Sequence, residues 1–193
     1  MQQENSALSL PIPGIWDIDP VHSAVGFSIT RLMITTIRGQ FTEFEGTIEI
    51  GEDPKAAKVQ VSLQTAGIHT NNKDRDNHLC SPDFLDAEHF PIITFVSTAC
   101  IPTKEHSLHI EGDLTIRGIT KSVALATDFR GTIVDPSGNT RVGFSAHTEI
   151  NREDFGISFN QPLEAGGVLL GKTVQIQLEV ESILQSENQA AAK

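Results

Sequence analysis

Apolar and polar residues alternate with a period of two along much of this chain. The clearest run covers residues 173–181, where apolar side chains occupy every second position; its apolar members are Val174, Ile176, Leu178 and Val180. A period of two places successive side chains on opposite faces of a β-strand. The same pattern predicts strands with one apolar face at 24–29, 45–50 and 59–64, and further strands are predicted at 92–97, 107–116, 122–129 and 141–150.

Turn-forming residues separate these predicted strands. Residues 51–54, 118–120 and 135–139 contain the Gly, Pro, Asp and Asn side chains that favour turns. Strands at hairpin spacing, with no long helical pattern between them, predict an antiparallel sheet, and closure into a barrel removes its edges. We therefore predict one all-β domain over residues 14–184, with loose polar tails at 1–13 and 185–193.

One segment breaks the alternation. Residues 71–80 are polar and aperiodic, and Ser81 is followed by Pro82. Serine is a favoured N-cap, and proline is favoured at the first helical position. The pattern predicts one or two short helices here, on or beside the barrel, with a helix starting at Ser81.

Charge and length restrict the class of protein. The chain has 193 residues, which suits a single domain, and a formal net charge of −11. Nucleic acids and anionic membrane surfaces attract clustered Lys and Arg, so neither is an expected partner. The first residues show no basic region followed by an apolar run, and no stretch is long and apolar enough to span a bilayer. We expect a cytoplasmic protein without a transmembrane segment.

Two features bear on metal and redox chemistry. Cys80 and Cys100 form no Cys-x-x-Cys motif, and two buried free thiols are favoured, although a disulfide between them stays open. Asp74, Asp76 and His78, with His69 upstream, have metal-binding side chains, but their spacing fits no zinc or calcium loop. Carboxylates near a helix start also interact with free backbone N–H groups. We predict no metal site.

Five groups of short sequence motifs follow one another along the chain. They are WDIDPVHS at 16–23, GQF and FEG within 39–46, DNHL, SPDFLD and FPIITF within 76–95, GDLTIRGITK at 112–121, and INREDFG at 150–156. Together these blocks resemble the YceI-like family of polyisoprenoid-binding, lipocalin-like proteins, and the resemblance runs from about residue 16 to residue 183.

The resemblance implies both a fold and a function. The expected fold is an elongated, eight-stranded antiparallel lipocalin-like barrel with an apolar channel. The expected ligand is a polyisoprenoid, an isoprenoid quinone or a fatty-acyl compound, held by a carrier, storage or buffer protein that needs no cofactor and pairs as a homodimer. Many members carry a signal peptide, whereas for this chain we expect none.

The predicted wall of the channel is mainly aromatic. Ten Phe, one Trp and no Tyr indicate an interior with few polar groups, although the same residues could simply fill the core. A filled barrel would serve only as an interaction protein. The predicted wall residues are Phe27, Ile29, Phe95, Leu114, Ile116, Phe129, Phe144, Phe155 and Phe159.

Polar residues in the matching blocks could contact a ligand's head group. His22 could do so with Ser23, or could fix the Asp19-Pro20 turn instead. Arg152 could do so as well, or could form an ion pair with Asp154 at a strand end. The alternative function is an enzyme acting on an isoprenoid or acyl lipid through His22 with Asp76 or His78. Against it, no Gly-x-Ser-x-Gly elbow, phosphate loop or His-Glu-x-x-His motif occurs.

Overall fold

Strands make up most of this protein. The computed structural model describes residues 11–104, 106–164 and 166–186. The strands are β1 Gly14–Ile18, β2 Ala24–Arg31, β3 Thr35–Phe41, β4 Phe44–Ile50, β5 Lys58–Gln64, β6 Ile68–His69, β7 Ile92–Lys104, β8 Ser107–Ile116, β9 Ile119–Val134, β10 Thr140–Asn151 and β11 Leu170–Leu184. The helical elements are α1 Lys73–Leu79 and the 3-10 turns η1 Pro54–Ala56, η2 Thr65–Gly67 and η3 Arg152–Phe155.

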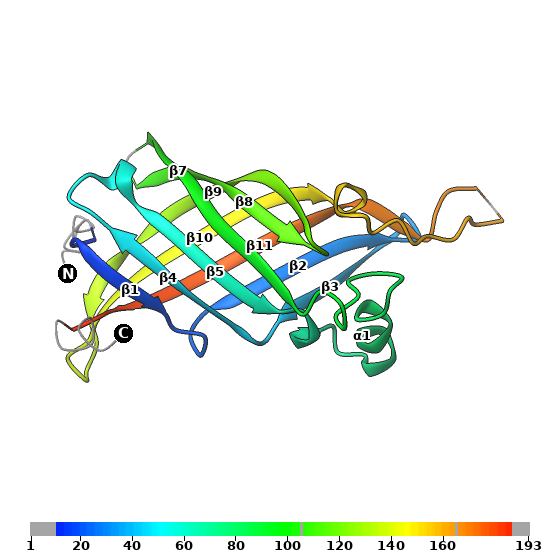
Figure 1. Cartoon of the computed structure of the whole chain (residues 1–193), viewed down its shortest axis with the longest axis horizontal. Coiled ribbons are helices and arrows are strands. Elements are labelled where there is room, and N and C mark those ends of the chain that lie inside the picture. The colour runs from blue at the N-terminus through cyan, green and yellow to red at the C-terminus, as the bar shows by residue number, and fades with distance from the viewer. Residues whose placement is uncertain (1–10, 105, 165, 187–193) are drawn as a thin grey trace, which may run out of the picture.

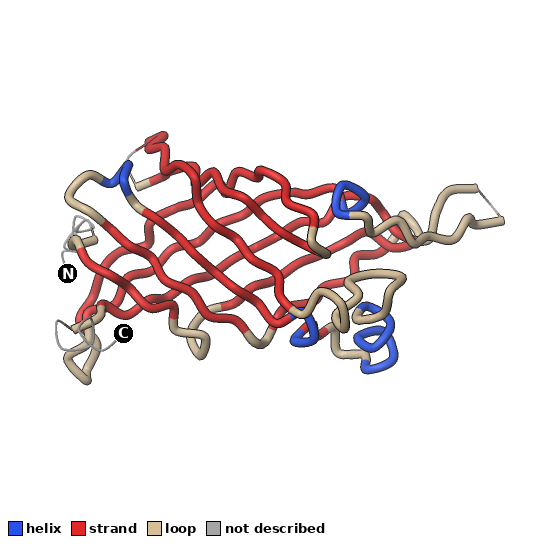
Figure 2. Tube along the Cα trace, viewed as in Figure 1, coloured by secondary structure: helices blue, strands red, loops and turns tan. Residues whose placement is uncertain are grey.

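Eight of these strands form a closed antiparallel ring. Its order is β1-β4-β5-β7-β8-β9-β10-β11, and pairing between β1 and β11 closes it. The long strand β11 pairs with β1 near its end and with β2 along its first part, and β3 and β6 continue the sheet from β2. The predicted eight-stranded antiparallel barrel is confirmed (Figures 1 and 2).

The alternation in the sequence explains why the sheet closes around an apolar interior. Ile176 of β11 lies opposite Phe27 of β2, and Leu178 lies opposite Val25. Directly paired residues point to the same face of a sheet, so the apolar sets of neighbouring strands meet on the inside. The predicted alternating segments all lie within strands.

The predicted turns lie between strands, but the one predicted at 118–120 is one residue earlier, because Ile119 and Thr120 already belong to β9. Between β8 and β9, Arg117 and Gly118 both have positive φ, at 51° and 70°, which is the geometry of a two-residue turn that matches strand twist. At 135–139 the carboxylate of Asp135 accepts hydrogen bonds from the backbone N–H groups of Ser137 and Asn139, each at 2.9 Å.

The predicted helix start at Ser81 is wrong. The helix α1 lies earlier, at Lys73–Leu79, and Asn72 is its N-cap, because its side chain accepts from the backbone N–H of Arg75 at 2.9 Å. Ser81 follows the C-cap. After it the chain makes one turn, in which the backbone N–H groups of Phe84 and Asp86 both bond to the Ser81 carbonyl. Asp86 has a φ of 52°, and this left-handed conformation prevents a second helix.

The two ends of the barrel differ. Strand β1 begins and β11 ends at one end, whereas α1 and η3 lie at the other (Figure 1). Trp16 is fully buried and packs with Phe129 and Val142 in one cluster. No helix within the described ranges is long and apolar enough to cross a membrane. The predicted tails, 1–13 and 185–193, fall largely outside the described residues.

Candidate functional site

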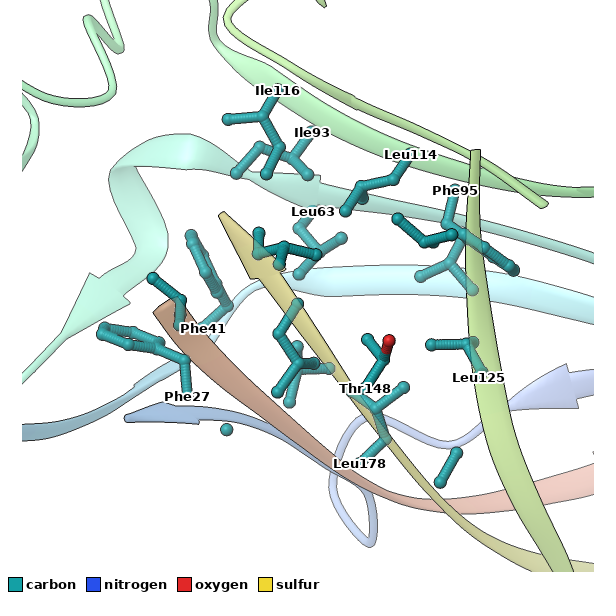
Figure 3. Close-up of a pocket in the computed structure, with 18 of the residues that line it drawn as sticks. Phe27, Phe41, Leu63, Ile93, Phe95, Leu114, Ile116, Leu125, Thr148 and Leu178 are labelled. Carbon is teal, nitrogen blue, oxygen red and sulfur yellow. The ribbon is translucent and has the colours of Figure 1, made fainter. Parts of the chain in front are cut away.

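The barrel encloses a cavity of about 710 Å³. Every strand of the described chain contributes to its wall, as do α1 and η3. Figure 3 shows Phe27 and Phe41 on one side of this space and Leu114, Phe95 and Leu125 on the other. The inward side chains therefore leave room between them, as in those small barrels that hold one ligand.

Most of the predicted wall residues do line this cavity. Those that line it are Phe27, Ile29, Phe95, Leu114, Ile116, Phe144, Phe155 and Phe159. Phe129 does not belong to the wall. It is opposite Phe144 on the neighbouring strand, with ring centroids 5.7 Å apart, and it packs into the cluster around Trp16. The indole and Val142 fill the space that Phe129 faces, so this ring belongs to the core.

His22 lies outside the cavity wall, in the turn between β1 and β2. Its Nδ1 is 2.8 Å from Oδ2 of Asp19, and more than half of its side chain is exposed. The hydroxyl of Ser23 donates to the carbonyl of Glu181 at 3.1 Å and accepts from the Glu181 N–H at 2.9 Å. Both residues thus fix the turn against β11, and His22 makes no contribution to the ligand cavity.

A network of charges extends from this turn. Nη1 of Arg141 is 2.8 Å from Oδ2 of Asp19 and also pairs with Glu181, while its Nε pairs with Asp135. Burial raises the pKa of Asp19, but the hydrogen bonds from Arg141 and His22 outweigh it and hold that pKa at about 2. The hydrogen bond from Arg141 likewise holds the pKa of Asp135 well below its usual range.

Three side chains of this network have the spacing of a metal site. Donor atoms of Asp19, His22 and Glu181 lie within 4.8 Å of one another. The guanidinium of Arg141, however, already pairs with both carboxylates. It supplies the positive charge that a metal ion would bring, so the cluster is explained as an ion-pair network.

The acidic and histidine side chains in and near α1 bond to one another and to the backbone. Oδ1 of Asp76 accepts from the backbone N–H of Thr70 at 2.9 Å, and His69 Nδ1 is 3.4 Å from Oδ2 of Asp76. His78 Nε2 lies 2.9 Å from Asp83 Oδ2, and its ring makes edge contacts with Phe84 and Phe159. His22 contacts a different set of residues, so the structure does not assemble the alternative catalytic group of His22 with Asp76 or His78.

Arg152 is the most deeply buried charged residue on the cavity wall, with only 3% of its surface exposed. Its Nε donates to the carbonyl of Gly171 at 2.9 Å, and its Nη1 donates to those of Ile157 and Phe159 at 2.7 and 2.9 Å. These bonds replace the predicted ion pair with Asp154, which is exposed. Burial lowers the pKa of Arg152.

The sequence patterns did not single out several wall residues. Arg31 continues the alternation of Val25, Phe27 and Ile29 on β2, so its spacing could have identified it. Arg75 and His78 reach the cavity from α1, and no strand pattern points to them. Cys80 and Cys100 are both free, and Cys100 lies on the wall; burial raises the pKa of each thiol.

The fold and the cavity agree with the similarity of this chain to known proteins. The model of the YceI-like domain matches residues 16–182. A UPF0312 protein of Pseudomonas putida (strain W619) is 36% identical over 170 residues, which cover 88% of this chain and 85% of the relative.

Solved structures share the fold at lower identity. BcnA of Burkholderia cenocepacia is 19% identical with a TM-score of 0.75, and the match covers 85% of this chain and 98% of that one. A polyisoprenoid binding domain from Saccharophagus degradans is 11% identical with a TM-score of 0.67, covering 90% and 100%. This chain belongs to the family defined by the YceI-like domain.

Proposed function

We propose that this protein binds one long apolar molecule inside its barrel. The observation that carries the proposal is the cavity of about 710 Å³, whose wall is made almost entirely of aliphatic and phenylalanine side chains. A cavity of this kind excludes polar solutes, because they would lose their hydrogen bonds to water without replacement. It suits a polyisoprenoid, an isoprenoid quinone or a fatty-acyl chain.

The energetics of burial are sufficient for such binding. A prenyl or acyl chain that buries roughly 400 to 600 Å² of apolar surface gains about 10 to 15 kcal/mol. Lost translational and chain freedom offsets several kcal/mol of this gain, which leaves an affinity of roughly micromolar to nanomolar. Binding of this strength needs no catalytic group, metal or cofactor, and it suits a carrier, storage or buffer protein.

The family supports the same proposal. The domain from Saccharophagus degradans with the same fold is a polyisoprenoid binding domain. By extension from the family resemblance, a homodimer in the cytoplasm stays a prediction for this chain.

Extraction of the purified protein tests the proposal. Protein isolated without detergent should release an acyl- or prenyl-type lipid into organic solvent, and native mass spectrometry should show the matching mass on the intact chain. After delipidation, a fluorescent apolar dye such as N-phenyl-1-naphthylamine should bind one to one. A protein that carries no lipid and takes up no dye would contradict the proposed function.

A further inference from the structure

The charges on the cavity wall are all of one sign. The chain has 25 acidic and only 14 basic residues. Among the described residues that line the cavity, however, no side chain is a carboxylate, and the charged ones are Arg31, Arg75 and Arg152. The cavity of this acidic protein is thus lined by three arginines and, among the described residues, by no carboxylate.

These three arginines come from different segments at the same end of the barrel. Arg31 ends β2, Arg75 belongs to α1, and Arg152 begins η3, and all three elements lie at the end opposite to the start of β1 (Figure 1). Arg31 pairs with Leu170, and Arg152 donates to the carbonyl of the next residue, Gly171. Apart from residues such as Thr127 and Thr148, the remaining length of the cavity is apolar, so the wall has one cationic end.

Arg152 forms no ion pair with a carboxylate in the described part of the chain. Its three hydrogen bonds go to neutral carbonyls, and its Nη2 is buried and has no hydrogen-bond partner among the described residues. Burial lowers the pKa of Arg152, and the negative charge of Glu153 offsets this only in part, because the Glu153 carboxylate is itself ion-paired with Lys172 at 2.9 Å. A buried cation without a partner is unfavourable, and a bound anion would relieve it.

The Arg75 side chain is held in one orientation by Thr70. Nε of Arg75 donates to the hydroxyl of Thr70 and Nη2 donates to the Thr70 carbonyl, both at 2.7 Å. These bonds use Nε and Nη2 and fix the guanidinium plane. A guanidinium whose plane is fixed is suited to carboxylate and phosphate oxygens, because its five N–H donors have a rigid geometry.

We propose that the ligand is an amphiphile with an anionic head, a carboxylate or a phosphate, which binds Arg152 together with Arg75 and Arg31 while its chain extends along the apolar part of the cavity. The inference rests on the proposed function and narrows it. A neutral alcohol or quinone of equal chain length would leave the charge of Arg152 uncompensated and would bind more weakly.

Three ligands with one chain and different heads test the inference. Hexadecanoic acid, hexadecyl phosphate and hexadecan-1-ol are titrated against delipidated protein at about pH 8, where both acids are charged, by displacement of N-phenyl-1-naphthylamine. At least one anion should bind about 10- to 100-fold more tightly than the alcohol, the scale of charge-assisted hydrogen bonds. The stronger anion identifies the head group as carboxylate or phosphate.

Arginine variants then test whether these three residues cause the tighter binding of the anion. Arg152→Gln, Arg75→Gln and Arg31→Gln should each reduce the ratio of alcohol to anion dissociation constants, with the largest reduction for Arg152→Gln. Affinity for the alcohol should change little. Arg38→Gln is the matched control, because it removes the same charge from an exposed position on β3 outside the cavity. If Arg152→Gln does not fold, the Arg31→Gln/Arg75→Gln double variant gives the result.

The outcomes separate this inference from the function on which it rests. Equal affinity for all three ligands, or an anion preference that survives in the arginine variants, would overturn the anionic head and leave the lipid-binding proposal in place. A uniform loss of affinity for all three ligands in Arg152→Gln would assign that residue a structural role only and would also count against the inference. Failure of every ligand to displace the dye would overturn the proposed function itself.

Discussion

The ring of Phe27 on β2 packs directly against Gly39 on β3. A Cβ atom at Gly39 would lie 2.4 Å from Cζ of Phe27, which is closer than side-chain atoms can approach. Phe95 and Gly112 repeat this arrangement on β7 and β8, again at 2.4 Å. In both pairs the missing side chain of the glycine lets the phenylalanine ring lie against the sheet. The two rings therefore occupy less of the cavity than they otherwise would.

The first prediction follows from this pairing. Gly39→Ala should push the Phe27 ring into the cavity, because the other close atoms are those of Phe27 itself and Thr70. The affinity for a sixteen-carbon ligand should fall about tenfold, since a displaced ring removes apolar contact worth about 1 to 1.5 kcal/mol. Shorter chains should be affected less, and dye displacement across a chain-length series measures this.

A matched control exists for that substitution. Gly51→Ala adds the same methyl group in the turn after β4, where the nearest atoms are 3.8 Å away, and it should leave binding unchanged. An equal effect on all chain lengths would show that Gly39→Ala disturbs the fold and not the size of the cavity.

The second prediction compares the wall with the turn. Phe144→Ala removes a wall side chain and should weaken lipid binding about tenfold, by the same area argument. His22→Ala should leave affinity unchanged and should cost about 1 kcal/mol or less of folding stability, because its hydrogen bond with Asp19 is largely exposed. Circular dichroism first shows whether both variants are folded. Titration with a lipid ligand then compares their affinities with that of the unmodified protein. Loss of binding in His22→Ala with full binding in Phe144→Ala would favour a polar site around His22.

The third prediction concerns acid. The pKa of Asp19 is held at about 2 in the folded protein, below its ordinary value of 3.8, and the pKa of Asp135 is lowered in the same direction. A lowered pKa contributes stability above the ordinary value, and this contribution is lost as the pH falls toward the folded value. The melting temperature should therefore fall between about pH 5 and pH 2.

A substitution assigns that loss to the network. Asp19→Asn should melt at a lower temperature at neutral pH and should show a shallower decline on acidification. Glu111→Gln changes an exposed residue on β8, and its melting temperature should decline with falling pH as steeply as that of the unmodified protein. If Asp19→Asn keeps the full acid-induced decline, the ion pair with Arg141 is not its source.

The fourth prediction concerns metal ions. Because Arg141 already pairs with Asp19 and Glu181, treatment with a chelator should leave both the melting temperature and lipid affinity unchanged. Differential scanning fluorimetry with and without the chelator tests this. A decrease of many degrees that added zinc or calcium reverses would mean that the cluster of Asp19, His22 and Glu181 binds an ion.

Sequence alternation predicted most of the barrel but not all of its strands. It identified β11 and β5, in which inward positions are consistently apolar. It did not identify β3, because the inward set of Ile37, Gly39 and Phe41 is interrupted by a glycine that the Phe27 ring covers. It also missed β1, where Ile15 and Trp16 put apolar side chains on both faces. A strand whose partner supplies the missing side chain has no clear pattern of its own.

The site was predictable where it depends on strand alternation. Eight of the nine predicted wall residues line the cavity, and the ninth, Phe129, points inward but faces a region that Trp16 fills. Which part of a barrel is filled depends on packing between distant segments, and alternation cannot show that. The same limit applies to Arg75 and His78, because a helix brings them to the wall from outside the sheet.

The position of β11 determines when this protein can fold during its synthesis. This last strand pairs with β10 and with the first two strands, β1 and β2, so until it is made the other seven strands of the ring can form only an open sheet that runs from β1 to β10. Contacts between residues so far apart in sequence are slow to form. On the ribosome, the chain must therefore wait with open sheet edges until residue 184 has emerged, and only then does the cavity exist. Ring closure, and with it the enclosed cavity, thus depends on the placement of one strand.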